Sequence, residues 1–171
     1  MNSNDTMRND TLNRTGLDTA GHVEAGAVVD QLNSFLRGEV SAVETYRQAI
    51  DKLQSVKDQR GVTLLNQLMA SHQGRVTQLR DEVVRLGGTP AEGSGIWGTF
   101  AKMVEGAAEL FGEKPAIAAL EEGEDHGLKD YREGLDKLDM TTRQWIESVI
   151  FPEQKKTHNA LRDFKKQLAA S

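Results

Sequence analysis

Apolar residues recur at every third or fourth position along most of the chain, which is the period of an amphipathic α-helix. The pattern predicts helices over about 25–56, 61–86, 115–137 and 141–169. In the first of these the apolar positions are Leu32, Phe35, Leu36, Ala42, Val43, Tyr46, Ile50 and Leu53. Pro152 lies inside the last stretch and predicts a kink or a break there, because proline removes a helical hydrogen bond.

The segments outside these helices have a different composition. Residues 1–24 are rich in polar residues and carry almost no large apolar side chains, so we expect a flexible tail ahead of a single domain at 25–171. The second helix should end at Gly87-Gly88, where glycine can supply a left-handed cap. The Gly-rich stretch and the amphipathic piece that follow, up to about residue 111, predict a long connection with a short extra helix.

An internal repeat relates the two halves of the chain. Residues 38–53 (GEVSAVETYRQAIDKL) and 123–138 (GEDHGLKDYREGLDKL) share a pattern of Gly-Glu, a small residue, Tyr-Arg and Asp-Lys-Leu at an offset of 85 residues. The repeat predicts two helical hairpins whose apolar stripes bury one another. Together with the long connection between the hairpins, it predicts an all-α, ferritin-like four-helix bundle.

The repeat places one acid on the apolar stripe of each hairpin. Glu39 lies three residues after Leu36 and seven before Tyr46, and Glu124 lies four after Leu120 and seven before its own tyrosine, Tyr131. An isolated ionised carboxylate in a core is costly, so each acid must be protonated, paired, hydrogen-bonded or bound to a metal. We therefore expect the two acids to lie close together near the pseudo-two-fold axis of the bundle.

Three further residues could join the two acids in a metal site. His72 falls on the stripe of the second helix, and His158 follows 86 residues later on the fourth, with Glu153 five residues before it. Carboxylate and imidazole groups suit iron or manganese. The candidate metal ligands are Glu39, His72, Glu124, His158 and Glu153. The alternative is a metal-free polar core, in which Tyr46 and Tyr131 donate hydrogen bonds to the acids.

Several of these features resemble a known superfamily. The segment Glu-x-x-small-x-x-x-Tyr, once per hairpin, is similar to the ferritin-like superfamily and to its rubrerythrin branch in particular. The chain more closely resembles a bacterial ferritin-like family of unknown function, domain of unknown function 2383, over about 27–169. The segments that carry this resemblance are Leu-Gly-Gly-Thr-Pro at 86–90, Trp97-Gly98 and Leu-Glu-Glu-Gly-Glu-Asp at 120–125. The resemblance implies a four-helix bundle and supplies no established activity.

The chain departs from the di-iron pattern of that superfamily. Di-iron members carry Glu-x-x-His on the second and fourth helices, with the glutamates bridging the metals. The positions three residues before His72 and His158 are Met69 and Lys155, which cannot bridge a metal pair. The first hypothesis is therefore a non-catalytic bundle, a stress-associated binding or structural protein. The second is an iron- or manganese-binding protein with a degenerate carboxylate and histidine site.

Composition narrows the classes of function that remain. The chain has 171 residues and a net charge of −5. It has no cysteine, which excludes disulfides and thiolate metal sites and fits a cytoplasmic protein. The basic residues form no patch or arm, so we expect no nucleic-acid partner. No apolar run approaches the roughly 18 residues of a membrane span. A homo-oligomer is the partner that we expect.

Overall fold

The computed structural model describes residues 12–54, 59–95 and 113–170, and every described regular element is helical. The elements are α1 (Leu12–Gln54), α2 (Gln59–Arg85), α4 (Glu113–Gly134), a 3-10 turn (Leu135–Lys137), α5 (Met140–Trp145), a π-helical turn (Ile146–Ile150) and α6 (Phe151–Ala170). α5, the π-turn and α6 follow one another without interruption and act as the fourth helix of the bundle.

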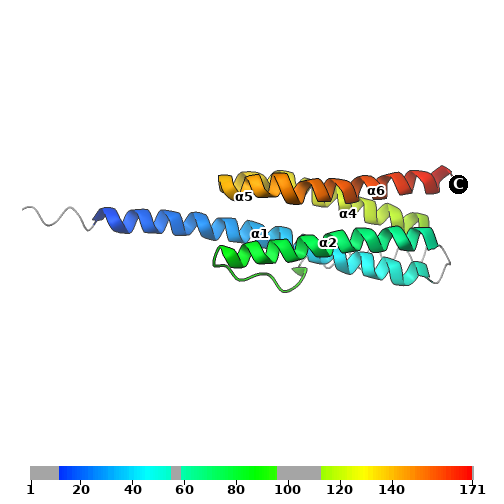
Figure 1. The fold of residues 1–171 in the computed structure, drawn as a ribbon, viewed down its shortest axis with the longest axis horizontal. Helices are drawn as coiled ribbons and strands as arrows, with labels where there is room; N and C mark the ends of the chain where they lie inside the picture. The colour runs from blue at the N-terminus through cyan, green and yellow to red at the C-terminus, as the bar shows by residue number, and fades with distance from the viewer. Residues whose placement is uncertain (1–11, 55–58, 96–112, 171) are drawn as a thin grey trace, which may run out of the picture.

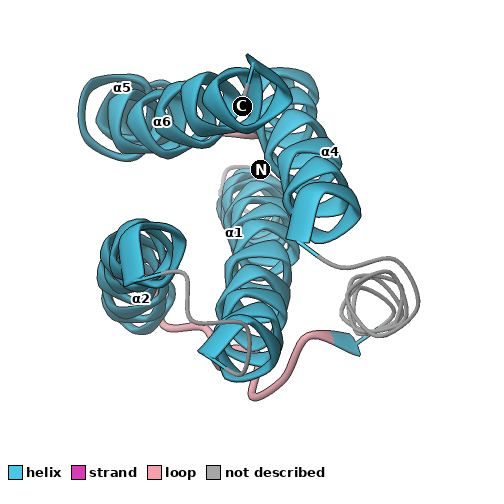
Figure 2. Ribbon diagram, turned by 90° about the vertical axis from the view of Figure 1, so that its right-hand side faces the viewer, coloured by secondary structure: helices cyan, strands magenta, loops and turns pink. Residues whose placement is uncertain are grey.

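The helices form two antiparallel hairpins in the order of a ferritin-like bundle (Figure 1). α1 pairs with α2, and α4 pairs with α6. α2 and α4 run in the same direction, so the end of α2 and the start of α4 lie at opposite ends of the bundle. Viewed along the axis, α1 lies between α2 and α4 (Figure 2). The predicted all-α four-helix architecture is confirmed.

The N-terminal boundary differs from the prediction. α1 begins at Leu12, and its first part projects beyond the other helices (Figure 1). The expected flexible tail at 1–24 therefore overlaps this helix from residue 12 onward, while residues 1–11 lie outside the described part of the chain. The predicted short helix of the connection, at 97–111, lies outside it as well. The division into a tail and a domain at 25–171 stays a prediction.

Both predicted irregularities of the helices have a local cause. α2 ends as expected: Gly87 has φ 78°, its N–H donates to the Val84 carbonyl, and the N–H of Gly88 donates to the Val83 carbonyl. This is a Schellman cap. Pro152 does not break the fourth helix. The π-turn directly precedes it, and there the N–H of Phe151 donates to the carbonyl of Ile146, five residues back.

The π-turn also shifts the buried face of the fourth helix. Val149 is 39% exposed, whereas Ile146 and Ile150 are fully buried. The extra residue in the turn rotates the helix relative to a regular α-helix, so the stripe changes phase at this point. No helix in the ranges that the structure describes is long and apolar enough to cross a membrane.

The core consists of two apolar clusters, one toward each end of the bundle. One contains Tyr46, Ala49, Ile50, Leu53, Leu65, Leu68, Ile117, Leu120 and Leu161. The other contains Val28, Leu32, Phe35, Leu36, Leu79, Val83, Tyr131, Ile146 and Ile150. Between the stretches that each helix gives to these clusters lie its buried polar residues, Glu39, His72, Arg75, Glu124, Gln154 and Thr157. The chain thus places a polar layer in the middle of an otherwise apolar bundle.

Candidate functional site: a polar network in the bundle core

All four helices contribute to the polar layer. α1 supplies Glu39 and Tyr46, α2 supplies His72 and Arg75, and α4 supplies Glu124 and Tyr131. α6 supplies Gln154 and Thr157. Each of these side chains belongs to a residue that is at most 3% exposed. Groups buried to this degree need hydrogen-bond partners, and the side chains of the layer supply them for one another.

Each tyrosine donates to the acid of the other repeat. The Tyr46 hydroxyl lies 2.5 Å from Oε1 of Glu124, and the Tyr131 hydroxyl lies 2.7 Å from Oε1 of Glu39. The crossing follows from the sequence, because acid and tyrosine are seven residues apart in both copies and the two helices run antiparallel. Seven residues are about two helical turns, so each tyrosine meets the opposite acid. The predicted donor role of both tyrosines is confirmed.

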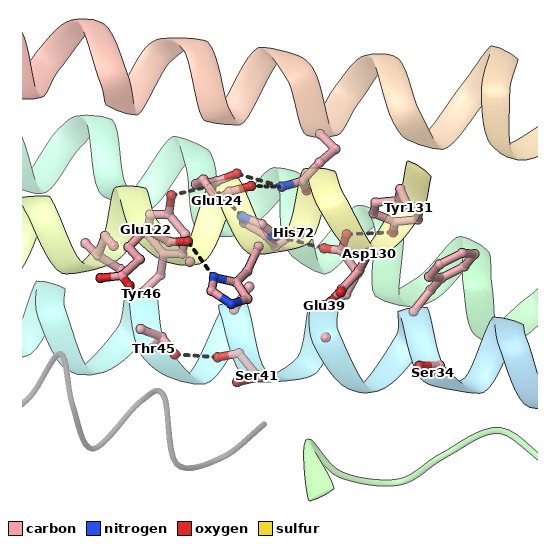
Figure 3. A pocket seen from close by; sticks show the side chains of 18 residues that line it. Ser34, Glu39, Ser41, Thr45, Tyr46, His72, Glu122, Glu124, Asp130 and Tyr131 are labelled. Atoms are coloured by element: carbon pink, nitrogen blue, oxygen red, sulfur yellow. Dashed lines mark hydrogen bonds and ion pairs between the residues drawn. The ribbon is translucent and has the colours of Figure 1, made fainter. Parts of the chain in front are cut away.

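His72 lies between the two acids and touches both (Figure 3). Its Nδ1 is 2.7 Å from Oε2 of Glu39, and its Nε2 is 2.9 Å from Oε1 of Glu124. A neutral ring would place one nitrogen lone pair against a carboxylate oxygen, whereas a doubly protonated ring donates at both ends. We therefore describe His72 as an imidazolium ion that bridges the acids.

Arg75 supplies the second internal cation. Its Nε donates to Oε1 of Glu39 at 2.8 Å, and its guanidinium also donates to the hydroxyl of Ser71 at 2.9 Å and to Oε1 of Gln154 at 2.8 Å. The residue is 1% exposed. One guanidinium nitrogen lies 2.6 Å from Nδ1 of His72. This nitrogen and Oε2 of Glu39 thus both face Nδ1 of His72, and the charge of Arg75 opposes the rise in the pKa of His72 that the two acids cause.

The pKa values follow from this arrangement. Burial alone would raise the pKa of Glu39, but the charges of Arg75 and His72 lower it to about 2. Burial opposes ionisation of Glu124 in the same way, and the charge and hydrogen bond of His72 lower its pKa. Burial disfavours the charged form of His72, yet Glu124 and Glu39 raise its pKa. Two carboxylates and two cations thus form a network with no net charge.

The fourth helix completes the shell around Glu124. Gln154 Nε2 donates to Oε2 of Glu124 at 2.8 Å, and the Thr157 hydroxyl donates to the same oxygen at 3.0 Å. Gly127 leaves room for this contact, because a Cβ at position 127 would lie 2.8 Å from Nε2 of Gln154. The small residue three positions after Glu124 thus serves close packing of α4 against α6. At Gly38 no atom lies within 4 Å of such a Cβ.

The donor set of this layer does not fit a di-iron centre. Every oxygen of the Glu39 and Glu124 carboxylates accepts at least one hydrogen bond from a protein donor. The two positions that would carry bridging glutamates hold Met69 and Gln154, which supply no charge. A guanidinium ion occupies the space beside the acids and would repel a metal ion. The layer is thus complete as an ion-pair and hydrogen-bond network.

The structure unites three of the five candidate metal ligands and separates the other two. Glu39, His72 and Glu124 are in direct contact. His158 turns away from this layer, and its Nε2 lies 2.7 Å from Oδ1 of Asp125. Glu153 is 42% exposed at its side chain and pairs with a neighbouring lysine on the same helix. Metal binding by the five together stays a prediction, and the geometry gives His158 and Glu153 no place beside the acids.

The expected register of the fourth helix was wrong by one residue. An offset of 86 residues pairs His158 with His72 and places Lys155 at the bridging position. Lys155 instead lies over the ring of Phe151, with Nζ 4.4 Å from the ring centroid. The strict offset of 85 residues matches His72 to Thr157 and Met69 to Gln154. Applied without adjustment, it would have found both residues that α6 gives to the network.

The sequence analysis did not predict that Arg75 is buried, although its spacing from apolar residues indicated it. It lies seven residues after Leu68 and four before Leu79, on the same stripe as His72. Arginine is usually solvent-exposed, so its charge argued against the core. A buried arginine requires paired acids, and the two acids on the facing stripes were the clue to its place.

A pocket of about 420 Å³ opens between α1 and α4 onto this network (Figure 3). Small residues, Gly38 and Ala42 on α1 and Gly127 on α4, leave the space between the helices. Tyr46, Tyr131 and both acids contribute to its polar floor. The exposed side chains of Glu122 and His126 also line it.

Comparisons with known proteins agree with this architecture. The structure is similar to a crystal structure described as ferritin-like, diiron-carboxylate proteins from Bacillus anthracis str. Ames, with a TM-score of 0.67 and 16% sequence identity over 83% of this chain and 97% of that one. At this identity the likeness concerns the fold alone. No curated protein matches the sequence. A family model, Domain of unknown function (DUF2383), matches residues 27–137, more than half of the chain. The chain therefore belongs to the DUF2383 family.

Proposed function

We propose that this protein is a non-catalytic ferritin-like bundle with a binding role, in which its own cations replace the metal ions of a di-iron core. The observation that carries this proposal is the position of Arg75. Its guanidinium donates to Glu39 and lies against His72, between the acid of α1 and the amide of α6. The charge that two carboxylates need is thus supplied from within the chain.

Redox catalysis at a di-iron centre needs coordination positions where oxygen or a ferrous ion can bind. Here the carboxylate oxygens are occupied by protein donors, and the neutral side chains Met69 and Gln154 stand at the bridging positions. Opening such a site would leave a buried guanidinium and an imidazolium without their acids. This costs several kcal/mol for each uncompensated charge.

The test is oxygen-dependent oxidation of ferrous ion by the purified protein. We expect ferric ion to form no faster than in buffer without protein, and no faster with the wild type than with Glu39→Gln. A rate well above that of buffer, lost in Glu39→Gln and kept in His126→Gln, would contradict the proposal. His126 is a suitable control because it is exposed and has no contact with the acids.

The second candidate is an iron- or manganese-binding protein. It is favoured by the direct contact of Glu39, His72 and Glu124, one nitrogen and two carboxylate groups of the kind these ions prefer. A single ion would then have to displace both the His72 protons and Arg75. After anaerobic incubation with Mn²⁺ and desalting, this candidate predicts about one ion per chain, lost in Glu124→Gln. The metal-free network predicts equal retention by the two proteins.

The pocket between α1 and α4 supports the binding part of the proposal. Its walls are mostly small and apolar, and its volume of about 420 Å³ is in the range of small-molecule sites. We expect the neutral dye Nile red to bind the native protein with a gain in fluorescence. Gly38→Trp should abolish the gain, because a side chain at position 38 extends into the open space of the pocket.

Gly74→Trp is the matched control for the dye experiment. Gly74 is also a helical glycine with nothing within 4 Å of an added Cβ, but it lies exposed on α2 and does not line the pocket. Equal dye binding by both variants and by the wild type would show that the dye binds elsewhere. It would remove the pocket from the proposal.

A further inference from the structure

A second group of possible metal ligands lies outside the core network, between α4 and α6. Glu121 and Asp125 come from α4, and His158 comes from α6. Their candidate ligand atoms all lie within 4.8 Å of one another. Nε2 of His158 is 2.7 Å from Oδ1 of Asp125. The neighbouring positions Glu124 and Thr157 point to the core, so these three residues are the outward-facing side of the same contact between helices.

The three side chains are held in different ways. Glu121 and Asp125 are four residues apart on one helix, so they lie on the same face one turn from each other. The His158 side chain is 11% exposed, which fixes its ring between the helices, and that of Glu121 is 15% exposed. The Asp125 side chain is 61% exposed. The group thus combines two largely buried ligands with one exposed ligand at the surface.

We propose that His158, Asp125 and Glu121 form a binding site for a divalent first-row transition-metal ion such as Zn²⁺. One imidazole nitrogen and two carboxylates are ligands that this ion accepts, with water in the remaining position. Bonds of about 2.0–2.2 Å place ligand atoms roughly 3.3 to 3.6 Å apart in a tetrahedral site. A small rotation of Asp125 and Glu121 brings atoms that are within 4.8 Å to this spacing.

A lysine competes with the ion for one ligand. Lys165 Nζ lies 2.5 Å from Oε2 of Glu121, and both side chains are partly exposed. Metal binding must break this pair, because ammonium and metal ion cannot share the same carboxylate without repulsion. The lysine therefore weakens the site without closing it. A partly exposed pair of this kind changes an equilibrium by about two- to five-fold.

The test is calorimetric titration of the full, untagged and metal-stripped chain with Zn²⁺. We expect one site per chain that is about 100-fold weaker in His158→Gln, in line with the loss of a metal ligand or its support. Asp125→Asn should also weaken it. As an exposed residue it leaves the fold intact, so a misfolded His158 variant would not spoil the test. Lys165→Met should tighten binding by about two- to five-fold.

Two controls separate this site from other histidine and carboxylate groups. His126→Gln alters an exposed histidine on α4 whose Nδ1 lies 3.3 Å from the Glu122 carbonyl, and it should leave the affinity unchanged. Glu133→Gln alters an exposed acid on α4 that pairs with Lys129, and it should also leave the affinity unchanged. Zn²⁺ affinity that survives both His158→Gln and Asp125→Asn would overturn the proposal, and so would the absence of any binding to the wild type.

Discussion

Replacing Arg75 with methionine removes the internal cation on which the core network depends. Methionine has a similar length and fills the space left by the stem of arginine, so the change acts mainly on charge and hydrogen bonding. Glu39 would lose its Nε donor at 2.8 Å and Gln154 would lose its partner, while Glu39 stays buried. The carboxylate would keep the bonds from Tyr131 and His72.

Two independent arguments give the loss in free energy of unfolding that we expect for Arg75→Met. Removing one partner of a buried ion pair typically costs about 3–5 kcal/mol. Separately, the fall of the Glu39 pKa from 4.5 to about 2 corresponds to about 3 kcal/mol of stabilisation at neutral pH. Arg75 is the largest of the charges that lower this pKa, with His72 next. We therefore expect Arg75→Met to lower the free energy of unfolding by about 3 kcal/mol at pH 7.

The assay is urea unfolding followed by circular dichroism, with three comparison variants. Arg75→Lys keeps the charge without the planar fork and should lose less. Arg75→Met combined with Glu39→Gln should recover part of the loss, because no buried charge is then left unpaired. Arg85→Met removes an exposed arginine that pairs with Glu82 on the same helix and should leave the midpoint unchanged.

If Arg75→Met lowers the free energy of unfolding at pH 7 by less than about 1 kcal/mol, which is the size of an ordinary surface ion pair, Arg75 is not the main partner of Glu39. The same would follow if the double variant were no more stable than the single one. In that case the guanidinium would not be the partner that keeps Glu39 ionised.

Two further predictions use the same unfolding assay. Gly38→Ala should stabilise the protein by up to about 1 kcal/mol, because alanine favours the helix and the new Cβ meets nothing within 4 Å. Gly127→Ala, the same change, should destabilise it, because its Cβ displaces the amide of Gln154; equal effects would show that this contact is unimportant. Stability should peak between about pH 4.5 and 6.5. Glu39, whose pKa is lowered on folding, stabilises the folded state above pH 4.5, and this contribution is lost as the pH falls toward 2. His72, whose pKa is raised on folding, stabilises the folded state below pH 6.5, and this contribution is lost as the pH rises through the raised pKa. A monotonic rise in stability from pH 4 to 9 would contradict these assignments.

The sequence was sufficient to predict the fold and half of the site. The helical period and the 85-residue repeat predicted two hairpins, and the place of Glu39 and Glu124 on apolar stripes predicted their meeting in the core. The donor role of the two tyrosines was predicted as well, whereas the crossing of their bonds was explained by the equal spacing only after the structure showed it. These features depend on periodicity, which a single sequence records directly.

The remaining features depend on three-dimensional partners that periodicity does not specify. Arg75 lies on the buried stripe by spacing, but only the acids that meet it make its burial tolerable. His158 and Thr157 are adjacent in sequence and differ by about 100° around the helix, so a shift of one residue moved the expected ligand from the core to the surface. The π-turn before Pro152 could not be anticipated from the pattern, which assumes an unbroken α-helix.

We propose that Arg75 and His72 occupy the place that metal ions take in a di-iron bundle. Anomalous diffraction at the iron edge, from crystals soaked anaerobically in ferrous ion, tests it most directly. We expect no anomalous peak within about 2.5 Å of the Glu39 or Glu124 carboxylates, where iron bonded to oxygen would lie. A peak there, with the guanidinium of Arg75 displaced, would contradict it.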